Sequence, residues 1–135
     1  MTKSSLFSKF AMDNDKEEAG VWVNFGDGIR FKVRRLKSRK SQEVRKELDK
    51  PFTTEIRRGA LPDDVAQDLL VRQIAGGVVA AWEGVTDEQG NDVAYTPDNA
   101  YAILKKLPEL VDELLGLSLN KDSFKASDDQ AAEGN

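Results

Sequence analysis

The sequence contains no cysteine and no histidine among its 135 residues. This absence excludes disulfide bonds, thiolate and imidazole catalysis, and the commonest zinc ligands. An enzyme built from this chain would have to work with carboxylates, lysines and hydroxyl groups alone. We therefore expect a protein that is not an enzyme, uses no metal or cofactor, and acts by binding other molecules.

Long apolar runs are absent as well. No segment approaches the ~20 apolar residues that a membrane span needs, and the N-terminus lacks the charged-then-apolar pattern of a signal peptide. These features predict a cytoplasmic protein with no membrane contact. A chain of this length forms about one domain and buries roughly two-thirds of its unfolded surface, so a real core is expected.

The charge is small overall but unevenly distributed. The net charge is -4, yet residues 30–58 carry twelve of the 20 lysines and arginines against four acids, which gives this basic block +8 and leaves -12 elsewhere. Such a dipolar chain can attract partners of either sign, or place its basic block against its own acidic part.

The apolar periodicity predicts an α+β fold, with an N-terminal β-hairpin plus about four helices in a small single domain. Two alternating segments around Gly26-Asp27-Gly28 predict the hairpin at residues 21–34. Helical spacing, N-cap residues and prolines predict the helices. The expected helices begin after Ser41, at residues 61–64, after Thr96 and at Pro108. Residues 52–59 are either a loop or a short further helix.

The longest expected helix opens at residues 61–64 and continues to Trp82, because Leu70, Ile74, Val78 and Trp82 recur four residues apart and so share one helical face. Gly76 and Gly77 lie inside it. Each glycine costs about 1 kcal/mol relative to alanine in a helix, so the pair indicates a kink or another backbone packed very close. Residues 84–95 are expected to form a short loop or a second hairpin.

Three regions are expected from composition. Residues 1–19 are polar and predicted to be disordered or weakly ordered, with one amphipathic turn near Phe10 that could dock on the body or on a partner. Residues 20–124 form the folded domain. Residues 125–135 read as a disordered acidic tail.

The candidate partner-binding residues come from two apolar features and one basic run. Trp82 is either a core plug or a docking aromatic, and Val44 with Leu48 is either a core stripe or a surface for a client. The basic run is either a protein contact or a solvated charged face. The candidates are Arg34, Arg35, Arg39, Lys40, Val44, Leu48 and Trp82.

Two other functions compete with protein binding. A nucleic-acid-binding protein would use the basic block 30–58, with Phe31 or Trp22 stacking on a base, but the pI of about 4.9 and the lack of a binding motif disfavour it. A hard cation could gather Asp87, Glu88 and Asp92, but their spacing matches no calcium loop. A surface carboxylate cluster is the preferred interpretation.

A set of short motifs in a fixed order spans residues 20–124. They are Gly20-Val21-Trp22-Val23-x-Phe25-Gly26-Asp27-Gly28, Lys50-Pro51-Phe52, Arg57-Arg58-Gly59-x-Leu61, Trp82-Glu83-Gly84-Val85-x-Asp87-Glu88-x-Gly90, Tyr95-Thr96-Pro97-x-Asn99-Ala100, Leu107-Pro108-Glu109-Leu110 and Asp122-Ser123-Phe124. In this order the motifs resemble the tail assembly chaperones of long-tailed (siphovirus-type) bacteriophages. The chain departs from the expected pattern at Ser123, where that family is expected to have asparagine.

The resemblance implies a small viral protein that works in the host bacterial cytoplasm and is absent from the mature virion. It would bind the tape-measure protein, keep it soluble and help to recruit tail-tube subunits during tail assembly. The expected partners are therefore the tape-measure protein, the tail-tube protein and a longer frameshifted form of the chain itself. Several copies could line one long client, so a homo-oligomer is also expected.

Overall fold

The structure is a computed structural model that describes residues 5–126. Within this range three strands form one antiparallel sheet in the order β1-β2-β3, namely β1 (Val21–Gly26), β2 (Ile29–Val33) and β3 (Val79–Glu83). The α-helices are α1 (Leu6–Phe10), α2 (Asn14–Ala19), α3 (Arg39–Asp49), α4 (Thr53–Arg57), α5 (Asp63–Gln73), α6 (Pro97–Leu104) and α7 (Pro108–Leu119). Three short helical turns complete the chain, the 3-10 turns η1 (Lys50–Phe52) and η3 (Lys121–Phe124) and the π-helical turn η2 (Ile74–Val78). The expectations for residues 1–4 and 127–135 lie outside the described residues.

The predicted hairpin and the α+β class are confirmed. Asp27 and Gly28 have φ values of 56° and 79°, the left-handed backbone that a two-residue turn between twisted strands requires. The hairpin strand β2 also pairs with β3, so that Phe31 lies opposite both Val23 and Trp82. The fold therefore has one more strand and more helices than the sequence predicted.

The prediction of one helix from residues 61–64 to Trp82 is right at its start and wrong after Gln73. The α-helix α5 ends at Gln73, η2 follows for one turn, and the chain then continues as β3. The pairing register shifts opposite Lys32 and Val33, so Val79 and Trp82 are both buried although they are three residues apart. Apolar residues three or four positions apart therefore fit a bulged strand as well as they fit a helix. Trp82 lies on a strand and not at a helix end.

The close backbone approach expected at the glycine pair is present at Gly77. A Cβ atom on Gly77 would lie 2.7 Å from the Cα of Ser41, a distance that real Cβ atoms do not tolerate. Ser41 is fully buried there. The prediction that Ser41 is the N-cap of α3 is wrong. The cap is Ser38, whose hydroxyl accepts a hydrogen bond from the Ser41 amide at 3.3 Å, and this leaves the Ser41 side chain free to face α5.

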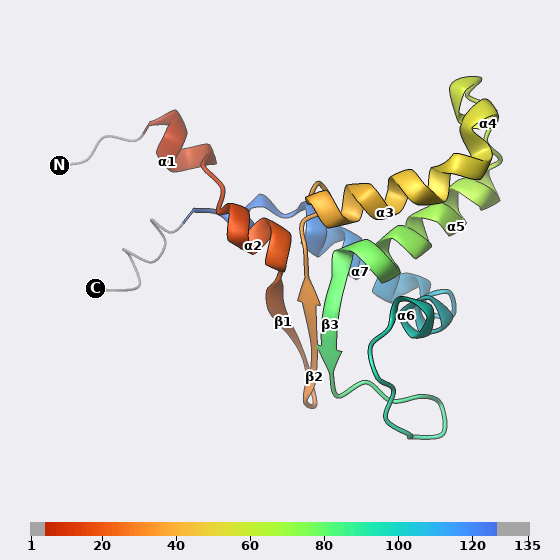
Figure 1. Ribbon diagram of the computed structural model, residues 1–135. Helices are drawn as coiled ribbons and strands as arrows, with labels where there is room; N and C mark the ends of the chain where they lie inside the picture. Colours follow the sequence, from red (N-terminus) through yellow and green to blue (C-terminus); the bar gives the residue numbers. More distant parts are fainter. Residues whose placement is uncertain (1–4, 127–135) are drawn as a thin grey trace, which may run out of the picture.

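Two short helices, α1 and α2, lie in the segment that composition predicts to be disordered or weakly ordered, and α1 (Leu6–Phe10) coincides with the amphipathic turn expected there. The Glu18 carboxylate of α2 accepts hydrogen bonds from the Arg39 amide at 3.0 and 2.9 Å, which caps the N-terminus of α3. The Asp13 amide donates to the Phe124 carbonyl at 2.8 Å. These contacts join α2 to the body, whereas α1 projects from one end of the molecule (Figure 1).

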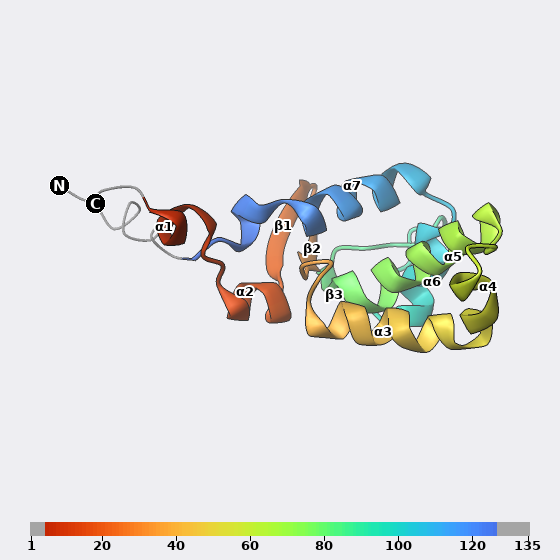
Figure 2. The same ribbon diagram turned by 90° about the horizontal axis from the view of Figure 1, so that it is seen from above.

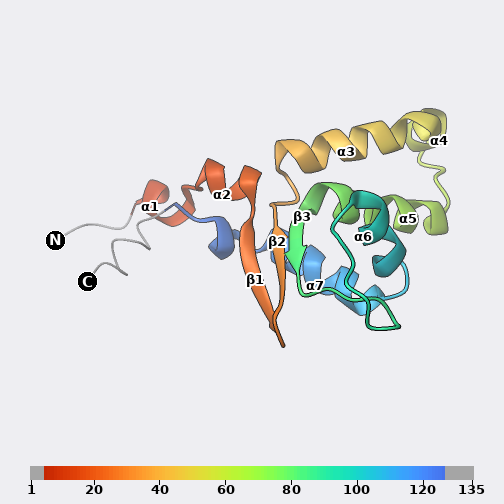
Figure 3. The ribbon, with the colours of Figure 1, turned by 60° about the horizontal axis from the view of Figure 1, so that its bottom comes forward.

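The turn η2 lies at the centre of the fold. It contacts α3, α5, α6, α7 and β3, and its residues Ile74 and Val78 are fully buried. Figure 2 shows α3 and α7 along opposite sides of the body, with α5 and α6 between them. The predicted helix starts at Thr96 and Pro108 are confirmed. Residues 84–95 form a loop closed by a single bridge between Thr86 and Asp92, beside α6 in Figure 3.

Candidate functional site

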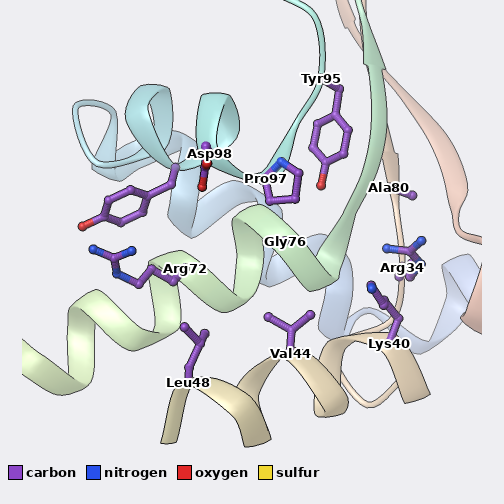
Figure 4. Close-up of a pocket in the computed structure, with 11 residues that line it drawn as sticks. Arg34, Lys40, Val44, Leu48, Arg72, Gly76, Ala80, Tyr95, Pro97 and Asp98 are labelled. Atoms are coloured by element: carbon purple, nitrogen blue, oxygen red, sulfur yellow. The ribbon is translucent and has the colours of Figure 1, made fainter. Parts of the chain in front are cut away.

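A groove lies between α3, η2 and α6, and we call it the basic groove. Its volume is about 320 Å³. Apolar side chains line its middle and cationic side chains stand at its two ends (Figure 4). The lining residues are Arg34, Lys40, Val44, Leu48, Arg72, Gly76, Ala80, Tyr95, Pro97, Asp98 and Tyr101.

One wall of the basic groove is α3. Val44 and Leu48 lie four residues apart on it, so both half-buried side chains face the groove. A polar network on the same face of α3 fixes this helix against α5. The Gln73 side-chain amide donates to the Ser41 hydroxyl at 2.9 Å, and the Arg45 guanidinium donates to the side-chain oxygen Oε1 of Gln73 at 3.1 Å. Polar contacts beside the apolar stripe therefore hold the helix in place.

The floor of the basic groove is Gly76, the glycine of η2 that precedes Gly77. A Cβ atom there would lie 3.5 Å from Pro97 Cβ and 3.7 Å from Val44 Cγ1, which is ordinary van der Waals contact. Glycine thus leaves a space between the two walls. The Tyr95 hydroxyl lies 2.7 and 2.8 Å from the carbonyl oxygens of Ala75 and Val79 and donates to them, and burial raises the pKa of this phenol.

One end of the basic groove carries Arg34 and Lys40. The Arg34 side chain donates to the Glu18 carbonyl at 2.9 Å and to the Gly77 carbonyl at 3.0 Å, so its position is fixed by the backbone around it. Lys40 is exposed and makes no ion pair within the part of the chain that the structure describes. At this end the Arg34 charge is therefore held in place by hydrogen bonds, and the Lys40 charge is exposed.

The other end carries Arg72, held by Asp68 and Tyr101. The Arg72 Nε donates to Asp68 Oδ2 at 2.8 Å, and its guanidinium lies 3.9 Å from the Tyr101 ring centre. The Tyr101 hydroxyl donates to the second carboxylate oxygen of Asp68. This hydrogen bond, followed by the one from Arg72, lowers the pKa of Asp68, and the same bond raises the pKa of Tyr101. Three cations and one acid, Asp98, line the groove in total.

The structure brings together four of the seven predicted site residues, Arg34, Lys40, Val44 and Leu48. Arg35 and Arg39 lie outside the groove, and Arg35 forms an ion pair with Glu17 at 3.2 Å. Trp82 is also outside it. Its indole is only 8% exposed and donates to the Val93 carbonyl at 2.7 Å, so it offers no free ring to a partner.

Trp82 contacts the basic groove indirectly, through Tyr95. Its ring makes edge contacts with Phe31 and Tyr95, whose centres lie 5.5 and 5.3 Å away. Tyr95 in turn lines the groove. Sequence reasoning missed Arg72, Pro97 and Tyr101 as groove residues. The spacing of Asp68 and Arg72 indicates a helical ion pair, but nothing in the sequence places it beside Tyr101.

The acidic loop residues do not form a cation site. Asp87 Oδ1 accepts hydrogen bonds from the amides of Gln89 and Asn91, both at 2.9 Å, and these backbone bonds lower the pKa of Asp87. Glu88 pairs with Lys106 at 3.2 Å. Over residues 5–126, no group of three or more acidic side chains is placed to hold a metal ion.

No helix in the described range is both long enough and apolar enough to cross a membrane.

Comparison with known protein families gives a match over most of the chain. No curated protein and no solved structure matches the chain. The family model of the YdaY prophage protein matches residues 36–135, which include most of the basic groove. The chain therefore belongs to the YdaY prophage protein family, a phage-derived family.

Proposed function

We propose that this protein is a tail assembly chaperone that holds a helical segment of the phage tape-measure protein in the basic groove. It keeps that client soluble in the host cytoplasm, helps to recruit tail-tube subunits, and leaves the assembly before the virion is complete. The resemblance of residues 20–124 to tail assembly chaperones supplies the client. Membership of a prophage family agrees with a phage role.

The observation that carries the proposal is the shape and charge of the basic groove. Val44 and Leu48 form an apolar strip one helical turn long, opposite Pro97 and above the bare backbone of Gly76. An amphipathic helix fits such a groove because its apolar residues recur at the same spacing, and many sequences satisfy that requirement. The cationic ends favour a client helix with acidic residues beside its apolar stripe.

The mode of action follows from what lines the groove. Three cations, one aspartate, two tyrosines and apolar side chains line it, and both tyrosine hydroxyls are engaged in hydrogen bonds within the protein. Such a lining suits binding of another surface. The proposed activity is therefore stoichiometric binding, with one groove occupied per client segment.

The direct test is co-expression with the tape-measure protein of the same phage. We expect the tape-measure protein to become soluble and to co-purify with more than one chain of this protein per client. A client that is equally soluble alone, or a complex that does not survive gentle purification, would contradict the proposal.

Two charge-reversal variants localise the contact. Lys40→Glu reverses an exposed charge in the groove, and Lys37→Glu makes the same change at an exposed lysine that does not line the groove. A charge at the edge of an interface contributes about 1 kcal/mol to binding, or about fivefold in affinity. We expect Lys40→Glu to weaken client binding by about this factor at an unchanged melting temperature, whereas Lys37→Glu should bind as the parent does. Equal effects of the two variants would place the contact elsewhere.

The alternative of a nucleic-acid-binding protein has one feature in its favour. Trp22 is 40% exposed, with the Arg30 guanidinium 4.3 Å from its ring centre, an arrangement that could accept a base. Against it, Phe31 is buried and both Arg34 and Arg35 are engaged within the protein. Salt-sensitive micromolar binding to arbitrary DNA at physiological ionic strength, lost on charge reversal in the basic block, would favour this alternative.

A further inference from the structure

Helix α1 presents an apolar face that no residue of the described range 5–126 covers. Leu6, Phe7 and Phe10 are 74, 83 and 55% exposed, and we call them the arm face. Two lysines flank it, Lys9 on the helix itself and Lys121, whose ammonium lies 4.9 Å from the Phe10 ring centre. The arm face is therefore apolar with a basic border.

A second groove has the complementary character. It has a volume of about 410 Å³ and lies between the loop 84–95 and α6. Val93, Ala102, Ile103 and Leu107 give it an apolar surface. Asp87 and Glu88 stand along its loop side, and one lysine, Lys106, also lines it and pairs with Glu88, so the acids outnumber the cation. We call it the acidic groove. Leu107 is 47% exposed, so part of this apolar surface is open to solvent.

The arm face cannot reach the acidic groove of its own chain. A β-bridge between Met12 and Lys125 and the hydrogen bond from the Asp13 amide to the Phe124 carbonyl hold the base of α1. Figures 1 and 2 both place α1 at one end of the molecule and α6 at the opposite part of the body. An occupant from this sequence must therefore come from a second copy.

Charge decides between the two grooves of that second copy. The basic groove presents Arg34, Lys40 and Arg72, which would repel the lysines that flank the arm face. The acidic groove presents Asp87 and Glu88, and Glu88 is exposed and paired only with the exposed Lys106 among the described residues. Apolar contact supplies the attraction, and the charges select the groove.

We propose that the arm face of one copy docks in the acidic groove of another, so that copies of this protein associate head to tail. The two surfaces differ, so each copy keeps a free arm at one end and a free groove at the other, and association continues beyond a dimer. The basic groove stays open in every copy. The arrangement adds to the proposed function and does not depend on which client the basic groove holds.

The test uses two variants that each remove one half of the contact. Phe7→Asp disables the arm face, and Leu107→Asp disables the acidic groove, at positions exposed enough for both chains to fold. A small interface of this kind associates weakly, so sedimentation velocity is measured from about 1 to about 200 µM. We expect the parent mass to rise with concentration beyond that of a dimer, and each variant alone to stay monomeric.

Mixing the two variants gives the decisive result. The Phe7→Asp chain keeps an intact groove and the Leu107→Asp chain keeps an intact arm, so an equimolar mixture should form a one-to-one dimer and nothing larger. Ile56→Asp, a change at an exposed apolar residue of α4 outside both surfaces, should behave as the parent does. A parent that is monomeric throughout, a single variant that still associates, or a mixture that stays monomeric would overturn the proposal.

Discussion

At the scale of single residues, aromatic side chains link the sheet to the candidate site. Phe31, Trp82 and Tyr95 form a row of edge contacts that begins in the sheet and ends at the basic groove. Trp82 is the middle member, and its indole also anchors the loop through the Val93 carbonyl. Its loss should therefore affect both the core and the groove.

The first prediction concerns this residue. Trp82→Ala should lower the free energy of unfolding by about 3–5 kcal/mol, as large aromatic truncations in cores do. Trp82→Phe should lose about 1 kcal/mol with the indole hydrogen bond, in addition to a smaller packing loss. Urea denaturation measures both, with Trp22→Ala on the exposed face of β1 as control. A Trp82→Ala chain as stable as the Trp22→Ala chain would argue against a core role.

The second prediction concerns the pH dependence of Asp68 and Tyr101. The pKa of Asp68 is lowered in the folded state by the Tyr101 hydrogen bond, so this stabilisation is present above the unfolded carboxyl pKa of about 3.9. The stabilisation is lost as the pH falls through the lowered pKa that Asp68 has in the folded state. Tyr101→Phe should therefore lower the free energy of unfolding by about 0.5–1 kcal/mol at pH 7 and by less at pH 2.5.

Tyr95→Phe is the matched control for that measurement. The Tyr95 hydroxyl donates to backbone carbonyls, which do not titrate. Its cost in unfolding free energy should be the same at both pH values. A Tyr101→Phe effect that is equally constant with pH would show that the Asp68 contact is absent in solution.

At the scale of elements, the position of α3 on η2 sets the width of the basic groove. Gly77 allows the backbone of α3 to approach η2, and the neighbouring Gly76 leaves the groove floor open. Adjacent glycines therefore have separate structural roles, one in packing and one in the shape of the site.

The third prediction compares these two glycines. Gly77→Ala should destabilise the protein by about 1–3 kcal/mol, because the new Cβ would meet the Ser41 backbone, which cannot move without shifting α3. Gly76→Ala meets its neighbours at ordinary contact distances and should stay within about 1 kcal/mol of the parent. Thermal or urea unfolding measures both. If Gly77→Ala and Gly76→Ala lower the free energy of unfolding equally, helix α3 lies farther from η2 than the structure places it.

At the scale of the whole molecule, the family match begins after the hairpin. Residues 36–135 leave β1 and β2 outside the matched region, although β2 is the central strand and carries the buried residues Phe31 and Val33. The matched region depends on this hairpin for its core, because β3 would otherwise have no strand partner and Trp82 would be uncovered.

The fourth prediction is that a chain of residues 36–135 does not fold by itself. Its circular dichroism should lack a cooperative thermal transition, because β3 and the core face behind it would be open to water. A chain of residues 11–135 keeps α2, the hairpin and the bridge at Met12, and it should melt close to the parent. A cooperative transition in the 36–135 chain at the parent temperature would contradict this account.

Several elements could be predicted because their signals are local. The hairpin follows from alternation around Asp27-Gly28, and the helix starts at Thr96 and Pro108 follow from capping chemistry. The strand β3 could not be predicted, because its apolar spacing also fits a helix and only pairing with β2 decides between them. Arg72, Pro97 and Tyr101 could not be assigned to the site for a related reason, since their nearness to Val44 depends on how α3, α5 and α6 pack.

By itself, the sequence determined the α+β class, the absence of cysteine and histidine chemistry, the uneven charge, and the requirement for either a kink or a close backbone approach at Gly76-Gly77. Each of these depends on composition or on residues within a few positions of one another. Only the tertiary structure decided that Trp82 lies in the core, that Val44 and Leu48 face a groove with Arg34 and Lys40, and that α1 is left uncovered. Burial and charge pairing join residues far apart in the chain, and the same apolar or basic side chain can be buried, paired or free according to which element packs over it.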